Sequence, residues 1–219
     1  MIIAIDGPAG AGKSTVASCL AKELGFVYLD TGAIYRALTL KALDKNIDLK
    51  DQPNLVKMSE NTNLDISNNK DGSIRILLDG EDVSERIRSP RVTQYVSNVA
   101  KIKGVRDQML KLQRNIGQSN DSVVDGRDIG TVVFPNADKK FYLDAEFNER
   151  VNRRFKELNA TNSRITQEEV ESDLKNRDCI DSTRQFAPLR KADDAVYIDT
   201  TNMTIEEVVE AILKIVRKD

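Results

Sequence analysis

The stretch GPAGAGKS at residues 7–14 constrains the fold of this chain more than any other part of its sequence. Its spacing, Gly7-x-x-x-x-Gly12-Lys13-Ser14, matches the phosphate-binding loop (P-loop) in full. The apolar run IIAI before it predicts a strand buried on both faces, and apolar residues at helical spacing follow it. A glycine-rich turn that merely begins a helix is the alternative. The flanking strand and helix favour a cradle whose backbone N–H groups point at phosphate oxygens.

This loop predicts that the chain binds a nucleoside triphosphate with Mg2+. Lys13 would reach the outer phosphates, and the Ser14 hydroxyl would ligate the metal. The ATP-binding residues expected from the motif are Gly7, Pro8, Ala9, Gly10, Ala11, Gly12, Lys13, Ser14 and Thr15.

The apolar pattern of the remaining chain indicates an α/β fold. Short strands are predicted at FVYLD (26–30), SVVDG (122–126), KKFYLDA (139–145) and AVYID (195–199). Helices are predicted after Asp30, near 91–115 as one basic helix, and after a capping box from Thr204 to Glu207. Strands that alternate with helices build a parallel sheet flanked by helices, here a P-loop NTPase core.

Two segments depart from this alternation and predict insertions into a single domain over residues 1–219. Residues about 60–100 contain apolar runs around the turn NNKDG, which is typical of two antiparallel strands. Residues about 147–185 carry a dense mixture of charges with one apolar helical stripe. We expect them to form a mobile helical insertion.

Charge and composition exclude several function classes. Lys and Arg total 33 against 35 Asp and Glu, so no global positive field exists to hold a nucleic acid. No stretch is apolar enough for a membrane span, and we expect a cytoplasmic protein that binds neither nucleic acid nor membrane. Histidine is absent, and two cysteines are too few for a disulfide framework or a cysteine zinc site. The chemistry must therefore use carboxylates, Lys, Arg, hydroxyls, backbone amides and a hard metal ion.

Asp125, at the end of SVVDG, is the candidate carboxylate for that metal. It could hold Mg2+ through water, as the acidic residue of other P-loop proteins does. An aspartate that closes a strand is often only a turn residue, so both interpretations stay open.

Phosphoryl transfer fits the chain better than a switch or a motor. A GTPase switch needs an Asp three residues before a glycine, which occurs nowhere here, and the Asn-Lys-Asp at 69–71 lies in the predicted turn. A transport ATPase needs coupling elements for which 219 residues leave little room. A small kinase needs a second anion site made of arginines, on segments that close over the P-loop.

Arginine is the residue expected in that second site, because its planar fork grips phosphate bidentately. Arg36 and Arg127 each follow a predicted strand end, where ligands of open α/β sheets bind. The charged insertion adds further candidates, although a lone helical arginine is most often solvated surface. These candidates are Arg150, Arg153, Arg154, Arg177 and Arg184.

Four motifs in this order resemble the bacterial cytidylate kinases nearly end to end. They are IDGPAGAGKST, LDTGAIYR, DGRDIGTVVFP and the pattern RDxxDxxR (Arg177, Asp178, Asp181, Arg184) followed by APL. The resemblance implies a nucleoside monophosphate kinase fold, with a monophosphate-binding insertion around 60–100 and a lid around 147–185. The implied reaction moves the γ-phosphate of ATP to CMP or dCMP, with Mg2+.

The resemblance also implies roles for individual residues. Thr31, Arg36 and Arg127 would hold the acceptor phosphate. Ser97, Arg106 and Asp128 match positions that read cytosine, and Asp181 and Arg184 match positions near the sugar. A carboxylate facing N4, and an arginine or a hydroxyl facing N3 and O2, would select cytosine over uracil. Without the resemblance, Asp128 and Arg106 would be interpreted as an ordinary ion pair.

The complete hypothesis is a monomeric kinase with MgATP and CMP or dCMP as substrates. Its catalytic residues would be Lys13, Arg127, Arg150, Arg154 and Arg177, and its metal residues Ser14 and Asp125, the latter through water. Two alternatives remain, namely a P-loop kinase for another small acceptor (UMP, AMP or a metabolite) and a non-catalytic ATP-binding regulator.

Overall fold

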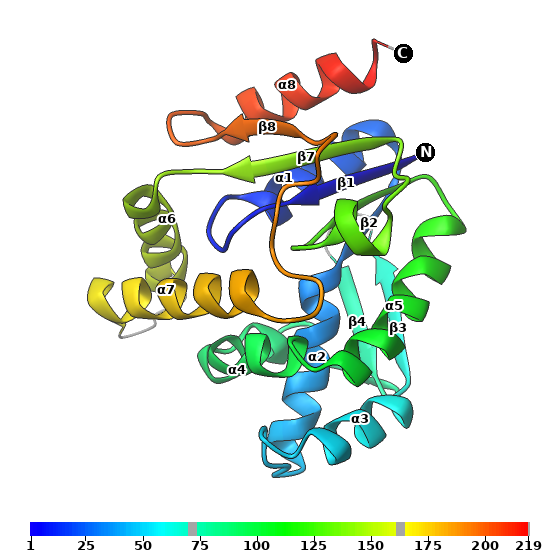
Figure 1. Ribbon diagram of the computed structural model, residues 1–219. Helices are drawn as coiled ribbons and strands as arrows, with labels where there is room; N and C mark the ends of the chain where they lie inside the picture. The colour runs from blue at the N-terminus through cyan, green and yellow to red at the C-terminus, as the bar shows by residue number, and fades with distance from the viewer. Residues whose placement is uncertain (70–73, 161–164, 219) are drawn as a thin grey trace.

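The computed structural model describes residues 1–69, 74–160 and 165–218 (Figure 1). Its central sheet has five parallel strands in the order β2-β6-β1-β7-β8. The P-loop strand β1 lies in the middle, which explains why its side chains are apolar toward both faces. The predicted parallel α/β fold is confirmed. The strands are β1 (Ile2–Asp6), β2 (Val27–Asp30), β6 (Ser122–Asp125), β7 (Lys139–Asp144) and β8 (Val196–Asp199).

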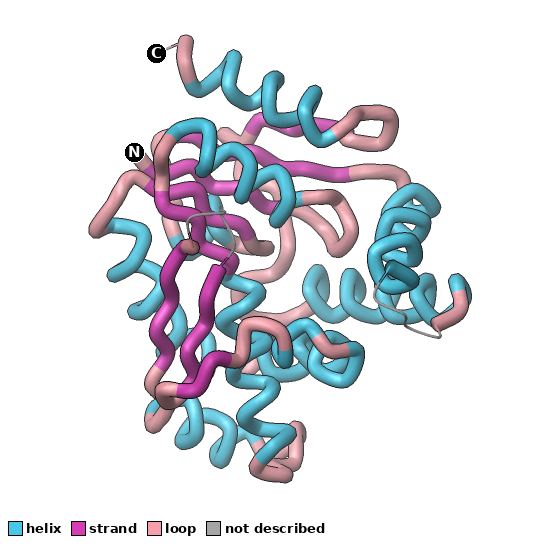
Figure 2. The backbone as a smooth tube through the Cα atoms, turned by 180° about the vertical axis from the view of Figure 1, so that it is seen from behind, coloured by secondary structure: helices cyan, strands magenta, loops and turns pink. Residues whose placement is uncertain are grey.

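Helices cover both faces of this sheet. Helices α1 (Lys13–Leu24) and α8 (Ile205–Val216) pack together on one face, which is turned toward the viewer in Figure 2. The opposite face contacts α5 (Lys103–Gln118) and the π-helical turn η2 (Ile129–Val133). The predicted capping box of α8 is present at Thr204 and Glu207. Among the described residues no helix is long and apolar enough to cross a membrane.

The chain between β2 and β6 forms most of the lower half of the molecule in Figure 1. Helix α2 (Thr31–Asp44) starts at the Asp30 cap, and α3 (Gln52–Glu60) and α4 (Pro90–Ala100) follow. The prediction of one basic helix near 91–115 is wrong, because α4 ends at Ala100 and α5 begins at Lys103. Ile102 between them is extended, with ψ 119°, and this breaks the helical hydrogen-bond ladder.

A second, antiparallel sheet joins β3 (Leu64–Asn68), β4 (Ile74–Leu78) and β5 (Glu81–Asp82), before the short helix η1 (Arg86–Arg88). The two antiparallel strands predicted in this region are confirmed, and most of their predicted turn, NNKDG, lies outside the described residues. Asn68 attaches this sheet to the free edge of β2. Its carboxamide accepts from the Tyr28 N–H and donates to the Tyr28 carbonyl, both at 2.9 Å.

The charged segment forms two helices, α6 (Phe147–Ala160) and α7 (Gln167–Thr183), which pack against each other. They stand beside the carboxyl end of the sheet, and α7 also contacts α4 (Figure 1). The apolar stripe predicted on α6 is real: Val151 joins Val170 and Leu174 of α7 in a small core of their own. Ala9 of the P-loop belongs to the same core, so this helix pair rests directly on the phosphate-binding loop.

Candidate active site

The P-loop has the backbone shape that its glycines predict. Gly7 has φ +147°, and a Cβ there would lie 1.9 Å from the Leu143 carbonyl oxygen of β7. Gly10 has φ +79°, and a Cβ there would come within 3.0 Å of Arg150 on α6. Both positions combine a left-handed backbone with a close neighbour, so only glycine fits without strain.

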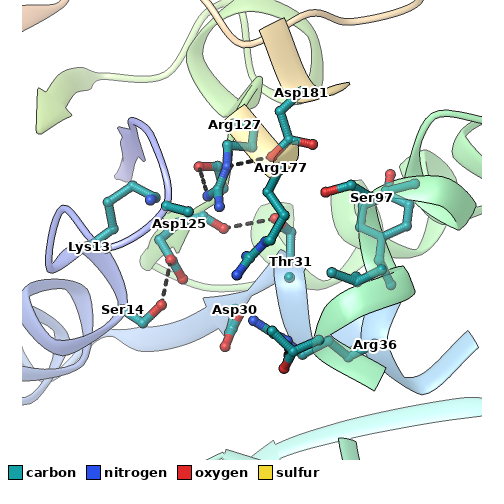
Figure 3. A pocket seen from close by; sticks show the side chains of 18 of the residues that line it. Lys13, Ser14, Asp30, Thr31, Arg36, Ser97, Asp125, Arg127, Arg177 and Asp181 are labelled. Carbon is teal, nitrogen blue, oxygen red and sulfur yellow. Dashed lines mark hydrogen bonds and ion pairs between the residues drawn. The ribbon is translucent and has the colours of Figure 1, made fainter. Parts of the chain in front are cut away.

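Lys13, the first residue of α1, is folded back onto this loop. Its side chain is buried, and Nζ donates to the Pro8 carbonyl at 2.6 Å. Burial, and then the charge of Arg127, lower the pKa of Lys13. In Figure 3 the Lys13 amine lies across from Asp125, at the side of the cleft formed by the P-loop. Burial disfavours the charged form of Lys13, and an anion bound in this loop would stabilise that charge.

All five strands of the central sheet end in aspartate, and four of these carboxylates accept hydrogen bonds from backbone N–H groups. Asp30 caps α2, Asp144 and Asp199 accept from residues one and two positions further on, and Asp6 accepts from the first two residues of η2. The four are Asp6 (Ile129 and Gly130 N–H, 2.8 and 2.7 Å), Asp30 (Ala33 N–H, 2.9 Å), Asp144 (Ala145 N–H, 2.8 Å) and Asp199 (Thr201 N–H, 2.9 Å).

Asp125 is the exception, because its described partners are two hydroxyl groups. Ser14 Oγ donates to Oδ2 and the Tyr28 hydroxyl donates to Oδ1, each at 2.9 Å. Burial and the neighbouring Asp30 raise the pKa of Asp125. Asp125 is therefore no simple turn residue: it is a buried carboxylate held beside the P-loop serine, where a cation would stabilise its charge.

A cleft of about 370 Å³ runs from the P-loop, past the ends of β2 and β6, to α4, α5 and α7. It brings together most of the residues that the sequence singles out, although they come from segments far apart in the chain. The residues singled out from the sequence that do not line it are Gly7, Pro8, Ala11, Arg150, Arg153 and Asp178. The predicted residues that line it are Ala9, Gly10, Gly12, Lys13, Ser14, Thr15, Thr31, Arg36, Ser97, Arg106, Asp125, Arg127, Asp128, Arg154, Arg177, Asp181 and Arg184.

The middle of the cleft is rich in arginine. Arg177 projects into it from α7 and faces Arg36 near Thr31 (Figure 3). Burial and the charge of Arg177 lower the pKa of Arg36, and burial and Arg127 lower that of Arg177. The Nε atoms of Arg154 and Arg177 are buried without a hydrogen-bond partner in the described part of the chain. Arg154 pairs with Glu157 at 2.8 Å and Arg177 lies 3.6 Å from Asp173, so these cations are partly compensated. Their unpartnered Nε atoms and the mutual repulsion of the arginines fit a site that is completed by anionic groups.

The far end of the cleft is an alternating chain of charges. Arg106 of α5 and Arg184 each donate to a different oxygen of Asp128, Arg184 at 3.2 Å. Arg127 Nε donates to Asp181 Oδ2 at 3.0 Å, and Arg184 lies 3.8 Å from the other oxygen. Burial raises the pKa of Asp181, but Arg127 and Arg184 more than offset this and leave it below the ordinary value. This chain joins α5, the loop after β6 and the C-terminal end of α7.

Arg150 does not point into the cleft but contacts the P-loop and α7. Its guanidinium donates to the Ala9 carbonyl at 2.9 Å, pairs with Asp178 and lies over the Phe147 ring. Arg153 instead binds the loop after β8, through the Thr200 hydroxyl and carbonyl.

Several residues of the cleft have no assignment from sequence. Tyr35 and Thr93 line it, the first beneath Arg106 and the second bound to Arg36 at 2.9 Å, and Arg88 reaches it from η1. Tyr35 could have been found from its place beside Arg36 in DTGAIYR. Tyr28 contacts Asp125 from 97 residues away, and no local pattern predicts that contact.

Comparisons with known proteins identify the family and the fold of this chain. A family profile described as cytidylate kinase matches residues 3–218. The chain is 52% identical to a cytidylate kinase of Clostridioides difficile, over 97% of this chain and 96% of the relative. It is 50% identical to one of Caldanaerobacter subterraneus subsp. tengcongensis, over 99% and 95%. A crystal structure of an uncharacterised protein from Eubacterium ventriosum shares the fold, with a TM-score of 0.53 and 12% identity over 100% and 99% of the chains.

Proposed function

The chain belongs to the cytidylate kinase family, and on that premise we propose that it transfers the γ-phosphoryl group of MgATP to CMP or dCMP. The observation that carries the proposal is the continuity of the cleft. It runs from a P-loop, past two arginines whose Nε atoms lack a hydrogen-bond partner among the described residues, to a buried carboxylate–arginine pair suited to a pyrimidine base. Phosphoryl transfer needs both substrates positioned in one water-poor site, and such a cleft can do this.

The P-loop would hold ATP. Its backbone N–H groups and the start of α1 would bind the β- and γ-phosphates, with Lys13 across the outer oxygens. Lys13 already lies in this loop, and its burial favours an anionic partner.

Ser14 and Asp125 fit Mg2+, because a hydroxyl and a carboxylate are hard oxygen donors. The described residues contain no group of three acidic, cysteine or histidine side chains around a metal site. Mg2+ would therefore take its other ligands from phosphates and water, with Asp125 acting through water. Bound there, the ion would neutralise charge that develops on the β- and γ-phosphate oxygens.

The acceptor phosphate would lie in the arginine-rich middle of the cleft. Arg36, Arg127 and Thr31 would orient it so that its oxygen can attack the γ-phosphorus in line. Arg36 is held by Thr93 and Arg127 by Asp181, so both guanidinium groups are fixed before substrate arrives. Fixed donors stabilise developing charge without reorganisation during the reaction.

Helices α6 and α7 would act as the lid, and the second sheet with α4 as the monophosphate-binding insertion. Arg154 and Arg177 would offset charge on the transferred group, which is supported by their unsatisfied Nε atoms. Arg150 would act through the P-loop, since its guanidinium is taken up by Ala9 and Asp178.

Cytosine would be read by Asp128, Arg106 and Ser97, and the sugar would lie near Asp181 and Arg184. The two arginines on Asp128 fix its position, and a carboxylate has lone pairs left for the N4 amine. Uracil has a carbonyl oxygen where cytosine has this amine. That oxygen and the Asp128 carboxylate are both hydrogen-bond acceptors and would repel each other, which disfavours uracil.

The test is Mg2+-dependent formation of ADP from ATP with CMP, dCMP, UMP, AMP or no acceptor, run in parallel. Turnover with CMP and dCMP far above the others is the expected result. Activity confined to another acceptor would leave a P-loop kinase but overturn the cytosine assignment. ATP binding without acceptor-stimulated ADP release would indicate a regulator.

A further inference from the structure

The Tyr28 hydroxyl is one of the two groups that hold the Asp125 carboxylate. Tyr28 lies in β2, the strand next to β6, and the two strands place Asp30 opposite Asp125. From two residues before that pair, the buried Tyr28 side chain reaches Asp125 Oδ1 at 2.9 Å. Ser14 Oγ holds the other oxygen at the same distance. Each carboxylate oxygen is thus bound from a different element of the core.

Tyr28 itself has little freedom to move. Its backbone N–H and carbonyl are both bound by the Asn68 side chain, and its neighbours in β2 pair with β6. Its ring belongs to the main hydrophobic core. The hydroxyl therefore donates from a rigid position, which is what an orienting group requires.

We propose that Tyr28 is a positioning residue for the metal: its hydroxyl orients Asp125 toward the cation that Ser14 would ligate. The inference rests on the proposed role of Asp125. The other four strand-end aspartates are fixed by backbone N–H groups, and Asp125 is fixed by hydroxyls.

The arrangement leaves the carboxylate able to act. The Ser14 hydroxyl can continue to donate its hydrogen bond to Asp125 while a lone pair of Ser14 Oγ ligates a metal ion. Tyr28 supplies the second fixed hydrogen-bond donor to the carboxylate. Each Asp125 oxygen accepts one described hydrogen bond and keeps a lone pair for water on the metal. Loss of the Tyr28 hydroxyl would leave Oδ1 without its donor and the carboxylate free to turn.

The test compares Tyr28→Phe with wild type in metal binding rather than in turnover alone. Phenylalanine keeps the ring in the core and removes only the hydroxyl. Mn2+ binding to the complex of the full chain with ADP is followed by electron paramagnetic resonance, and ADP binding in EDTA is measured by calorimetry. Tyr197→Phe is the matched control, because Tyr197 is exposed on β8.

Removing such an outer group should weaken Mn2+ binding about tenfold or more in Tyr28→Phe. ADP affinity in EDTA and the behaviour of Tyr197→Phe should match wild type. In turnover assays the Mg2+ concentration at half-maximal rate should rise while the KM for CMP stays constant. Mn2+ affinity within twofold of wild type would overturn the inference, and so would an equal loss of ADP affinity in EDTA.

Asp125→Asn, measured in the same way, separates this inference from the proposed function. Weakened Mn2+ binding in Asp125→Asn but not in Tyr28→Phe would overturn the role of Tyr28 alone. Unchanged Mn2+ binding in Asp125→Asn would remove Asp125 from the metal site and end both assignments, whatever Tyr28→Phe does.

Discussion

Asp178 on α7 accepts a hydrogen bond from the backbone N–H of Ala9 in the P-loop, at 3.1 Å and across 169 residues of sequence. The next peptide group of the loop is held as well, because Arg150 of α6 donates to the Ala9 carbonyl at 2.9 Å and pairs with Asp178. Both helices of the α6–α7 pair therefore grip one residue of the phosphate-binding loop.

Asp178→Ala should release the Ala9 amide. Hydrogen bonds to charged groups contribute about 1.5–3 kcal/mol, so exchange of the Ala9 amide hydrogen should accelerate roughly tenfold or more without nucleotide. Nuclear magnetic resonance measures this exchange. Glu171→Ala is the control on the same helix, since Glu171 pairs only with the exposed Lys175 among described residues. Equal exchange rates in the two variants would mean that the contact does not persist in solution.

Arg127→Ala should abolish most turnover while ATP binding stays nearly unchanged. Arg127 is bound to Asp181 in the part of the cleft that we assign to the acceptor phosphate. An arginine that stabilises a transferring phosphoryl group can contribute on the order of 1000-fold in rate. Steady-state kinetics with CMP and ATP calorimetry give the two quantities. Arg127→Lys, which keeps the charge but not the fork, should recover only part of the rate. A matching loss of ATP affinity would remove Arg127 from the acceptor site.

Asp128→Asn should reduce discrimination between CMP and UMP. It replaces the carboxylate that accepts from Arg106 and Arg184 by an amide, which can face either base. Loss of a charged hydrogen bond predicts about a 100-fold fall in kcat/KM for CMP, with a much smaller change for UMP. Competition between the two acceptors measures the ratio. Asp107→Asn, on the exposed side of α5, should leave it unchanged. A parallel fall for both acceptors would argue for a purely structural ion pair.

Asp6 should make folding stability depend on pH. Burial raises the pKa of Asp6 from its ordinary value of 3.8 to about 6, despite hydrogen bonds from Gly130 and Ile129. The folded state therefore holds the proton more tightly than the unfolded chain. The stability that protonated Asp6 contributes is complete below about pH 4, and about 3 kcal/mol of it is lost as the pH rises to about 6.

Urea denaturation of wild type and Asp6→Asn at several pH values checks this expectation. The unfolding free energy of wild type minus that of Asp6→Asn should fall between about pH 4 and 6 and stay constant above about pH 7. A difference that is constant over the whole range would show that Asp6 titrates alike in both states.

The sequence is most informative where structure is local. The P-loop needs its glycines within eight residues, the strands are marked by short apolar runs, and the α8 cap lies within four residues. The break between α4 and α5 is less visible, because Lys101 and Ile102 carry no proline or glycine signal. Helix α3 has a proline near its start and an Asp51 cap, but too few apolar residues to stand out.

The candidate site shows the same division. Lys13, Ser14 and Asp125 can be found from the strand ends and the loop, whereas the cytosine positions follow only from family resemblance. Contacts such as Tyr28 with Asp125, or Arg150 with Ala9, join segments about 100 residues or more apart. Their partners are decided by how the elements pack, which no single motif encodes. The roles assigned to these residues, and the monomeric state, stay predictions.

The two hydrogen bonds between the Asn68 side chain and the Tyr28 backbone also bear on intermolecular strand pairing at the edge of the sheet. An outer strand normally presents unpaired N–H and carbonyl groups that can recruit a strand from another chain. At β2 both outward-facing groups of Tyr28 are occupied by one carboxamide, which imitates a neighbouring strand that is only one residue long. At Tyr28, therefore, the backbone groups that an added strand would need are already paired within the molecule.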